Sequence, residues 1–289
     1  MRPKANAALL LVALIWGSSF ISQEISARHH ITYLFNGASF LLGGLMLRPF
    51  VPRKNIITRG QWKWMFIAGV ILFIASTLQQ VGITYTQIAN ASFLTSLYII
   101  FIPFILWIAF RERPRWIDVL AILMAIIGAY LLSTAGVGIQ IQSGDTTSYL
   151  GDILEVLGAV FWGMHVVVLG KFAIKYNAIS FASGHFLITG IITLFLGLIL
   201  EDPARFLVPP LMFATVYRGL FSVGIGYTLQ VWSQNHTAST SAGLILSLES
   251  VFAAIFAFIL LGQNLLPIQV VGCAVVLLAV LLSQFKQDG

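Results

Sequence analysis

Long apolar runs alternate with short polar segments along the whole chain. Ten runs can be counted, and each is about 18–24 residues long. At about 1.5 Å per residue, a helix of ~20 residues crosses a hydrocarbon core of ~30 Å. Lipid offers no partner to an unpaired backbone amide, so each run is predicted to be a membrane-spanning α-helix. The predicted spans cover residues 5–22, 31–50, 64–83, 89–110, 116–135, 149–169, 179–200, 211–232, 238–261 and 266–285.

The ninth run, residues 238–261, carries one carboxylate near its middle, Glu249. An ionised carboxylate at that depth costs roughly 2.5–3.5 kcal/mol, so such a group usually faces a protein interior or a water-filled cavity. Two interpretations of Glu249 are open: a neutral, hydrogen-bonded structural residue, or a residue that binds substrate or a proton in a translocation path. The run also has small residues at steps of three and four, a pattern that lets membrane helices approach closely: Ser239, Gly243, Ser247, Ser250, Ala254 and Ala257.

The composition agrees with a membrane protein. Hydrophobic residues make up 58% of the 289 residues and charged residues only 9%, whereas soluble proteins carry roughly 25% charged residues. The net charge of +6 is small for this length and does not indicate a nucleic-acid partner. The single cysteine, Cys273, excludes an internal disulfide and a cluster of metal-binding thiols. No cofactor or metal site is therefore predicted, and the first run, which lacks a convincing cleavage site, is interpreted as an uncleaved span.

The basic residues are distributed unevenly between the two sides of the predicted bundle. Ten spans place both chain ends on one side. Of the 16 Lys and Arg residues, all but Arg28, Arg205 and Arg218 lie in the segments on that side. Because basic loops are retained in the cytoplasm, both termini are predicted to be cytoplasmic in a multi-pass protein of the cell (inner) membrane.

The chain contains an internal repeat. The sequence Thr-Leu-Gln at residues 77–79 recurs at residues 228–230, and Trp-Gly at 16–17 recurs at 162–163. The offset of 151 in the first match also aligns Tyr98 with Glu249. The connecting loop, residues 136–148, is the longest between spans. It separates two predicted units, residues 5–135 and 149–285.

Five spans in each unit is an odd number, so the second unit must enter the membrane from the opposite side. The sequence thus predicts an all-α membrane protein of ten transmembrane helices, arranged as two inverted five-helix repeats around a central cavity. Many secondary transporters follow this plan, and their substrate sites lie near the membrane midplane, between the repeats.

Particular motifs resemble those of the EamA family in the drug/metabolite transporter (DMT) superfamily. These are Ala-Leu-Ile-Trp-Gly at 13–17, its counterpart Ala-Val-Phe-Trp-Gly at 159–163, and Gly-Gln-Asn at 262–264 followed by Gln269 and Gly272. Gln263 stands where the family usually has Glu, and residues 111–113 keep the Glu but lack the Gly. The resemblance implies transport of small metabolites, often amino acids or related compounds and often outward. It also implies a cavity lined by the first, third, fourth, sixth, eighth and ninth helices.

Seven candidate substrate-binding residues lie on helices that the resemblance assigns to the cavity. A cation near an aromatic face gains roughly 0.5–2 kcal/mol, so aromatic residues beside Glu249 favour an amine-bearing or aromatic substrate. The alternatives are that the aromatic residues only pack and that the two glutamines bond neighbouring helices. The seven candidates are Trp16, Gln79, Tyr98, Trp162, Tyr227, Gln230 and Glu249.

Further ionisable residues are candidates for proton transfer or gating. Glu155 and Arg218 lie at similar predicted depths, about 9 and 10 Å, so an ion pair at an outer gate is one hypothesis. The alternative is that Arg218 extends to the membrane surface. His165 could relay protons, although it could equally be a hydrogen-bonded packing residue, and no zinc-ligand spacing joins it to His185.

The predicted function is a secondary transporter that exports amino acids or related amine or aromatic compounds by alternating access. Its predicted partners are the substrate, the bilayer and a coupling ion such as a proton, and its predicted state is a monomer or weak homodimer. A passive facilitator of the same substrates is the alternative. An intramembrane enzyme is disfavoured because Ser183-Gly184-His185 does not match a nucleophile motif, and no nucleotide-binding P-loop is present.

Overall fold

The computed structural model describes residues 1–53, 57–86, 88–134, 146–261 and 266–284, and within these ranges regular structure is entirely helical. The first half contains α1 (Arg2–Arg28), α2 (Tyr33–Leu47), α3 (Arg59–Tyr85), α4 (Ile88–Ser96), α5 (Tyr98–Phe110) and α6 (Trp116–Thr134). The second half contains α7 (Thr146–Phe172), α8 (Ala178–Leu200), α9 (Pro203–Phe206), α10 (Pro209–Tyr217), the π-helix η3 (Arg218–Tyr227), α11 (Thr228–Ser233), α12 (Ser239–Leu246), α13 (Glu249–Leu261) and α14 (Pro267–Gln284). Short 3₁₀ turns follow α2 and α7, namely η1 (Arg48–Phe50) and η2 (Ala173–Lys175).

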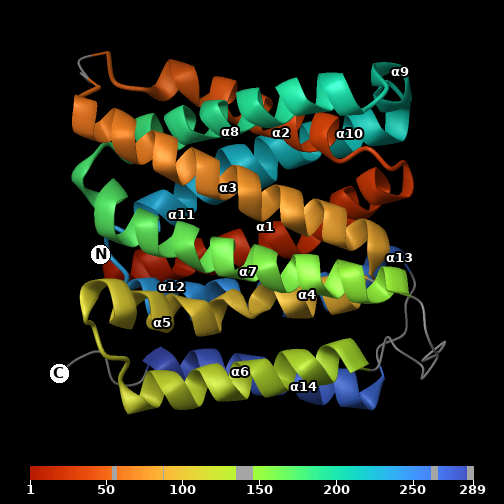
Figure 1. The fold of residues 1–289 in the computed structure, drawn as a ribbon. Coiled ribbons are helices and arrows are strands. Elements are labelled where there is room, and N and C mark those ends of the chain that lie inside the picture. The colour runs from red at the N-terminus through yellow and green to blue at the C-terminus, as the bar shows by residue number, and fades with distance from the viewer. Residues whose placement is uncertain (54–56, 87, 135–145, 262–265, 285–289) are drawn as a thin grey trace.

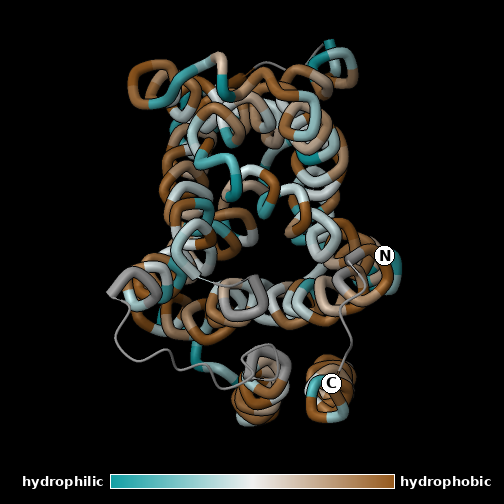
Figure 2. Tube along the Cα trace, turned by 90° about the vertical axis from the view of Figure 1, so that its right-hand side faces the viewer, coloured by the Kyte–Doolittle hydropathy of each residue, from teal (hydrophilic) through white to brown (hydrophobic). Residues whose placement is uncertain are grey.

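The helices pack side by side in one bundle (Figure 1), and hydrophobic residues colour most of its trace (Figure 2). Many large apolar side chains are exposed on its outside. Six segments in the described part of the chain are long and apolar enough to cross a membrane, and residues 116–131 and 267–283 form shorter apolar helices. Ile108 and Phe213 are more than three-quarters exposed. Exposed apolar side chains are favourable where the protein surface contacts lipid, because polar groups find no hydrogen-bond partners in the hydrocarbon core. The protein is therefore a helical membrane protein. The predicted run 31–50 contains the 15-residue α2, and the run 211–232 contains most of α10, η3 and α11.

Several helices of the first half have counterparts in the second half. Adding 151 to the residue numbers maps α4, α5 and α6 onto α12, α13 and α14 within a residue or two. The helix contacts correspond as well: α7 packs on α3 and α5, as α1 packs on η3, α11 and α13. The matching pairs α2–α8 and α6–α14 contact each other directly, the latter at one edge of the bundle (Figure 1). The repeated motifs therefore mark repeated structure.

Two predicted spans are each divided into two helices. The run 89–110 is interrupted at Leu97 and the run 238–261 at residues 247–248, so the prediction of continuous helices was wrong at both places. The hydroxyl of Ser96 donates to the Phe93 carbonyl (2.7 Å), and that of Ser247 donates to the Leu244 carbonyl (2.8 Å). Such bonds compete with the helical ladder. Ser96 and Ser247 are equivalent in the repeat, so both halves break at the same place.

Glu201, at the end of α8, caps the first turn of α2. Its carboxylate accepts hydrogen bonds from the backbone amides of Thr32 (2.6 Å), Tyr33 (2.9 Å) and Leu34 (2.8 Å). These amides have no partner within a helix, and no side chain of α2 itself caps them. A residue distant in sequence therefore fixes where α2 begins.

Replacing Glu201 with Ala is expected to lower the free energy of unfolding by about 2 kcal/mol, as the loss of a strong helix cap does. The measurement is the thermal midpoint of the purified protein in detergent. Glu24→Ala is the control, because Glu24 makes an exposed pair with Arg28 within one helix, and such pairs contribute little. Equal midpoints for the two variants would contradict the capping role.

Candidate functional site

A cavity of about 40 Å³ lies inside the bundle. Its walls come from α1, α3, α4, α5, α7, η3, α11, α12 and α13, which belong to the first, third, fourth, sixth, eighth and ninth predicted spans. All seven candidate substrate-binding residues lie on this one cavity, together with Arg218. The lining residues are Trp16, Ser19, Phe20, Gln23, Gln79, Thr95, Tyr98, Trp162, Val166, Arg218, Ser222, Tyr227, Gln230, Leu246 and Glu249.

Tyr98 and Glu249 face each other across the cavity. Each is the first residue of the helix that follows a break, α5 and α13 respectively. Both are at most 5% exposed, and the tyrosine hydroxyl donates a long hydrogen bond to the Gly243 carbonyl of α12 (3.5 Å). Since the two positions are equivalent in the repeat, the cavity brings the matching points of the two halves together.

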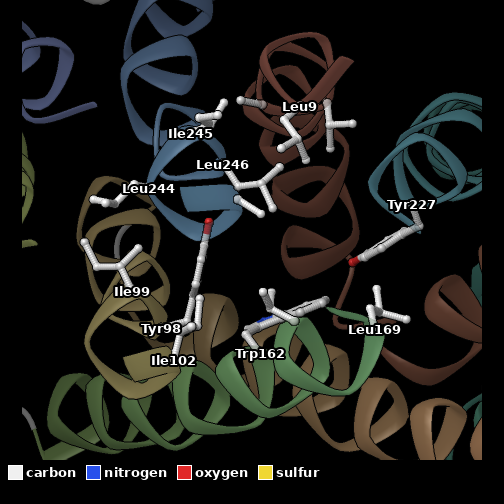
Figure 3. Close-up of a cluster of buried hydrophobic side chains, with 14 of the residues drawn as sticks. Leu9, Tyr98, Ile99, Ile102, Trp162, Leu169, Tyr227, Leu244, Ile245 and Leu246 are labelled. Atoms are coloured by element: carbon white, nitrogen blue, oxygen red, sulfur yellow. The ribbon is translucent and has the colours of Figure 1, made fainter. Parts of the chain in front are cut away.

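Aromatic rings form most of the remaining wall. Figure 3 shows Tyr98, Trp162 and Tyr227 converging from α5, α7 and η3. The Tyr227 ring centroid lies 4.6 Å from that of Trp16 and 6.0 Å from that of Trp162, with which it is nearly parallel. The Trp16 indole donates to the Ser222 carbonyl of the π-helix (3.3 Å). Three buried polar atoms of the wall, Gln23 Oε1, Trp162 Nε1 and Gln230 Oε1, have no hydrogen-bond partner within the described residues. They remain available to water or a ligand.

Arg218 is buried in the wall and is not paired with Glu155. Its guanidinium donates to the Asn36 side-chain oxygen and lies 5.0 and 5.3 Å from the ring centroids of Phe35 and Phe40. With 3% of its surface exposed, it does not extend to the membrane surface either. Glu155 instead accepts a hydrogen bond from Thr95 (2.8 Å). The hypothesis of an ion pair was wrong for this conformation, because similar depth along two helices does not fix the direction in which their side chains point.

His165 lies behind the wall. It is one turn beyond Trp162 on α7, but it does not line the cavity. Its ring centroid lies 5.5 Å from that of His185 and 6.1 Å from that of Tyr227. Both of its ring nitrogens are buried without a partner among the described residues. Any role in proton relay would require water to reach it.

Several polar lining residues were missed from the sequence. Ser19 and Gln23 follow Trp16 at steps of three and seven, so that with Phe20 they occupy one face of α1. That spacing was a usable signal once Trp16 was a candidate. Thr95 and Ser222 carried no comparable signal, since a single hydroxyl in an apolar run often bonds its own helix.

A helical membrane bundle with a buried polar cavity is the architecture of a small-molecule transporter. The EamA-like transporter family matches the sequence twice, over residues 3–134 and 149–285. The chain therefore belongs to the EamA-like transporter family, which confirms the resemblance inferred from its motifs.

Two relatives match nearly the whole chain. An uncharacterized transporter of Archaeoglobus fulgidus is 30% identical, over 98% of this chain and 86% of its own length. The chloroplastic WAT1-related protein At3g02690 of Arabidopsis thaliana is 24% identical, over 94% of this chain and 67% of its own length. One crystal structure, 17% identical, superposes with a TM-score of 0.82 over 98% of this chain and 97% of that one. This last similarity concerns the fold alone.

Proposed function

We propose that this protein is a secondary transporter that exports amino acids or closely related aromatic amines by alternating access. In this proposal ten spans form two inverted five-helix units, residues 5–135 and 149–285, joined by residues 136–148. The protein lies in the cell inner membrane with both termini in the cytoplasm. Support for the inverted arrangement comes from the odd number of spans in each unit, the corresponding helix contacts and the charge distribution.

The observation that carries the proposal is the pair of opposite charges on one buried cavity. Glu249 offers a carboxyl group and Arg218 a guanidinium, and both line the same space. Buried ionisable groups in membrane proteins usually mark a substrate or ion path. A substrate with an amine and a carboxylate complements both groups, because the amine pairs with Glu249 and the carboxylate with Arg218.

The aromatic wall and the glutamines fit the same substrate class. Trp16, Tyr98, Trp162 and Tyr227 surround the position where an amine would approach Glu249, and each such face contributes roughly 0.5–2 kcal/mol to cation binding. Gln79 and Gln230, equivalent in the repeat, supply neutral hydrogen-bonding groups. A cavity of about 40 Å³ has room for only a few water molecules. Substrate therefore enters only after one repeat moves against the other.

A ligand-stabilisation screen of the purified protein tests this substrate class. Any compound that binds the folded state stabilises it by mass action, by about 2.7 kcal/mol at one hundred times its Kd. Amino acids are expected to raise the thermal midpoint more than their decarboxylated amines or their N-acetylated forms. If no compound with an amine raises the midpoint while uncharged nucleosides do, the proposed substrate class is wrong.

Coupled transport is tested against the alternative of a passive facilitator. Sealed vesicles containing the protein should accumulate the stabilising compound above equilibrium when a proton gradient is imposed. A facilitator would only equalise the concentrations, whatever gradient is applied. Equilibration without accumulation under proton and sodium gradients alike would support the facilitator.

A further inference from the structure

We propose that Glu155 holds the coupling proton, at a site separate from the substrate cavity and linked to it through Thr95. This inference rests on the proposed function, because a coupling site has a role only in a transporter. It divides the work between two carboxyl groups: Glu249 contacts the substrate, and Glu155 carries the proton.

The geometry around Glu155 is that of a buried carboxyl one residue away from the cavity. Glu155 is 1% exposed and does not line the cavity. Its Oε2 accepts from the Thr95 hydroxyl (2.8 Å), and Thr95 in turn accepts from the Gln79 amide (3.3 Å). Thr95 and Gln79 both line the cavity. A change at the substrate site can therefore reach Glu155 through a single hydroxyl.

The second carboxyl oxygen has no partner. Glu155 Oε1 is buried without a hydrogen bond among the described residues. Helix α3 approaches it so closely at Gly82 that an added Cβ would lie 2.7 Å from this oxygen. An ionised carboxylate with an unpaired oxygen is strongly unfavourable in such surroundings. In this conformation the group is therefore neutral, with a proton as the neutralising ion.

Among the described residues, no basic side chain forms an ion pair with Glu155. The elements packed on α7 are α3, α4, α5, α12 and η2, of which α4 and α12 contain no ionisable side chain. On α3 the ionisable groups are Arg59 and Lys63 at the far end and Tyr85 near Gly82, while η2 holds Lys175, far along the chain. On α5 the ionisable group is Tyr98. On α7 itself the other ionisable groups are Tyr149, His165 and Lys171, of which Lys171 pairs with Glu112. Asp152, bonded to Thr86 (2.7 Å), has the same sign of charge as an ionised Glu155.

The fold does not need a carboxyl at this position. With the offset of 146, Glu155 corresponds to Leu9, which is fully buried in the first half. With the offset of 151, Thr95 corresponds to Leu246. Where Glu155 of the second half bonds to Thr95 of the first half, the repeat-equivalent positions are both leucines, Leu9 and Leu246. The equivalent place in the repeat is thus packed by apolar side chains, so the Glu155–Thr95 pair is not required for packing. A polar pair that packing does not require is expected at a functional site.

This placement gives a physical cycle for coupling. While α3 and α4 are packed on α7, the carboxyl is dry and keeps its proton. When the repeats move and α3 separates from α7, water reaches Glu155 and the proton can leave. Substrate movement and proton release are then linked because both require the same helices to move.

The first test detects the proton itself and needs no substrate. Infrared spectra of the protein in lipid at neutral pH should contain a protonated carboxyl stretch that is lost in Glu155→Gln and shifted in Thr95→Val. Glu155→Leu introduces the residue found at the equivalent position of the first half, Leu9, so this variant should fold. Loss of the band in this variant too shows that the loss does not come from misfolding. Glu24→Gln, at a half-buried carboxyl paired with Arg28, is the control and should leave the band unchanged. A band that remains at full strength and unshifted in Glu155→Gln would overturn the proposal.

The second test separates coupling from binding. Vesicles are loaded with radiolabelled proteinogenic amino acids, and exchange at equal concentrations is compared with accumulation driven by a pH gradient. Glu155→Gln and Glu155→Leu should keep the exchange but lose the accumulation. Unchanged accumulation, or accumulation that depends on sodium instead, would overturn the assignment of Glu155. Absence of exchange and of accumulation by the wild-type protein would count against the proposed function, while the infrared result would still decide where the proton resides.

Discussion

Glu249→Gln is expected to weaken binding of amine substrates about 30-fold or more and to abolish their transport. Removing one partner of a buried charge pair costs about 2–5 kcal/mol, and each 1.4 kcal/mol is tenfold in affinity. The glutamine has nearly the same shape, so folding should be preserved. The measurement is the affinity for the compound that stabilises the wild-type protein most, together with its uptake into vesicles.

Tyr98→Phe is the graded comparison for this prediction. It removes a hydroxyl that lies on the cavity with Glu249 and donates to the Gly243 carbonyl (3.5 Å), but it leaves the carboxyl and the aromatic face in place. One hydrogen bond contributes about 1 kcal/mol, so affinity should fall only about fivefold. If Glu249 is instead a structural residue, Glu249→Gln will change the thermal midpoint and leave affinity unaltered. That result would contradict the substrate role.

The long apolar helices and the repeat could be predicted from the sequence, because both leave local signals. Hydropathy locates a span wherever about 20 apolar residues follow one another, and repeated dipeptides and tripeptides survive divergence of the loops. Because hydropathy is averaged over about 20 residues, it does not detect a helix break of one or two residues. Averaged over its length the run 238–261 is apolar despite Ser247, so the only signal of the break was that Ser96 and Ser247 occupy matching positions in the two halves.

The pairing of buried polar residues could not be predicted, because it depends on direction as well as depth. The position of Arg218 along its run indicated how deep it lies. Its direction is fixed by the π-helix η3, whose wider turn rotates successive side chains differently from an α-helix. It therefore meets Asn36 on α2 rather than Glu155 on α7. Gln79 and Gln230 were easier to identify as candidates, because they occupy equivalent positions in the two halves and the presence of one strengthens the case for the other.

Gly17→Ala is expected to lower the free energy of unfolding by about 2–3 kcal/mol, which is typical of inserting a methyl group into a full core, and to impair transport. A Cβ at this position on α1 would lie 2.8 Å from both the Glu249 carbonyl oxygen and the Ala253 amide nitrogen of α13. Backbone atoms cannot rotate aside as a side chain can. Helix α1 must therefore move away from α13, at the turn that carries Glu249. The measurements are the thermal midpoint and vesicle uptake.

Two other glycines serve as matched controls, because an added Cβ would meet less crowded surroundings at each of them. At Gly163, the repeat equivalent of Gly17, an added Cβ would lie 3.0 Å from the Phe101 Cβ and 3.3 Å from the Tyr98 carbonyl oxygen. At Gly158, on the same helix as Gly163, the nearest atoms would be 3.5 Å away, which is an ordinary contact. Substitution with alanine should therefore lower the free energy of unfolding strongly at Gly17 and slightly at Gly163. At Gly158 it should leave the free energy of unfolding unchanged or raise it, because a helical glycine costs up to ~1 kcal/mol relative to alanine. A Gly17→Ala protein as stable as Gly158→Ala would mean that α1 and α13 are not packed backbone to backbone, and that Glu249 is not held in place by this contact.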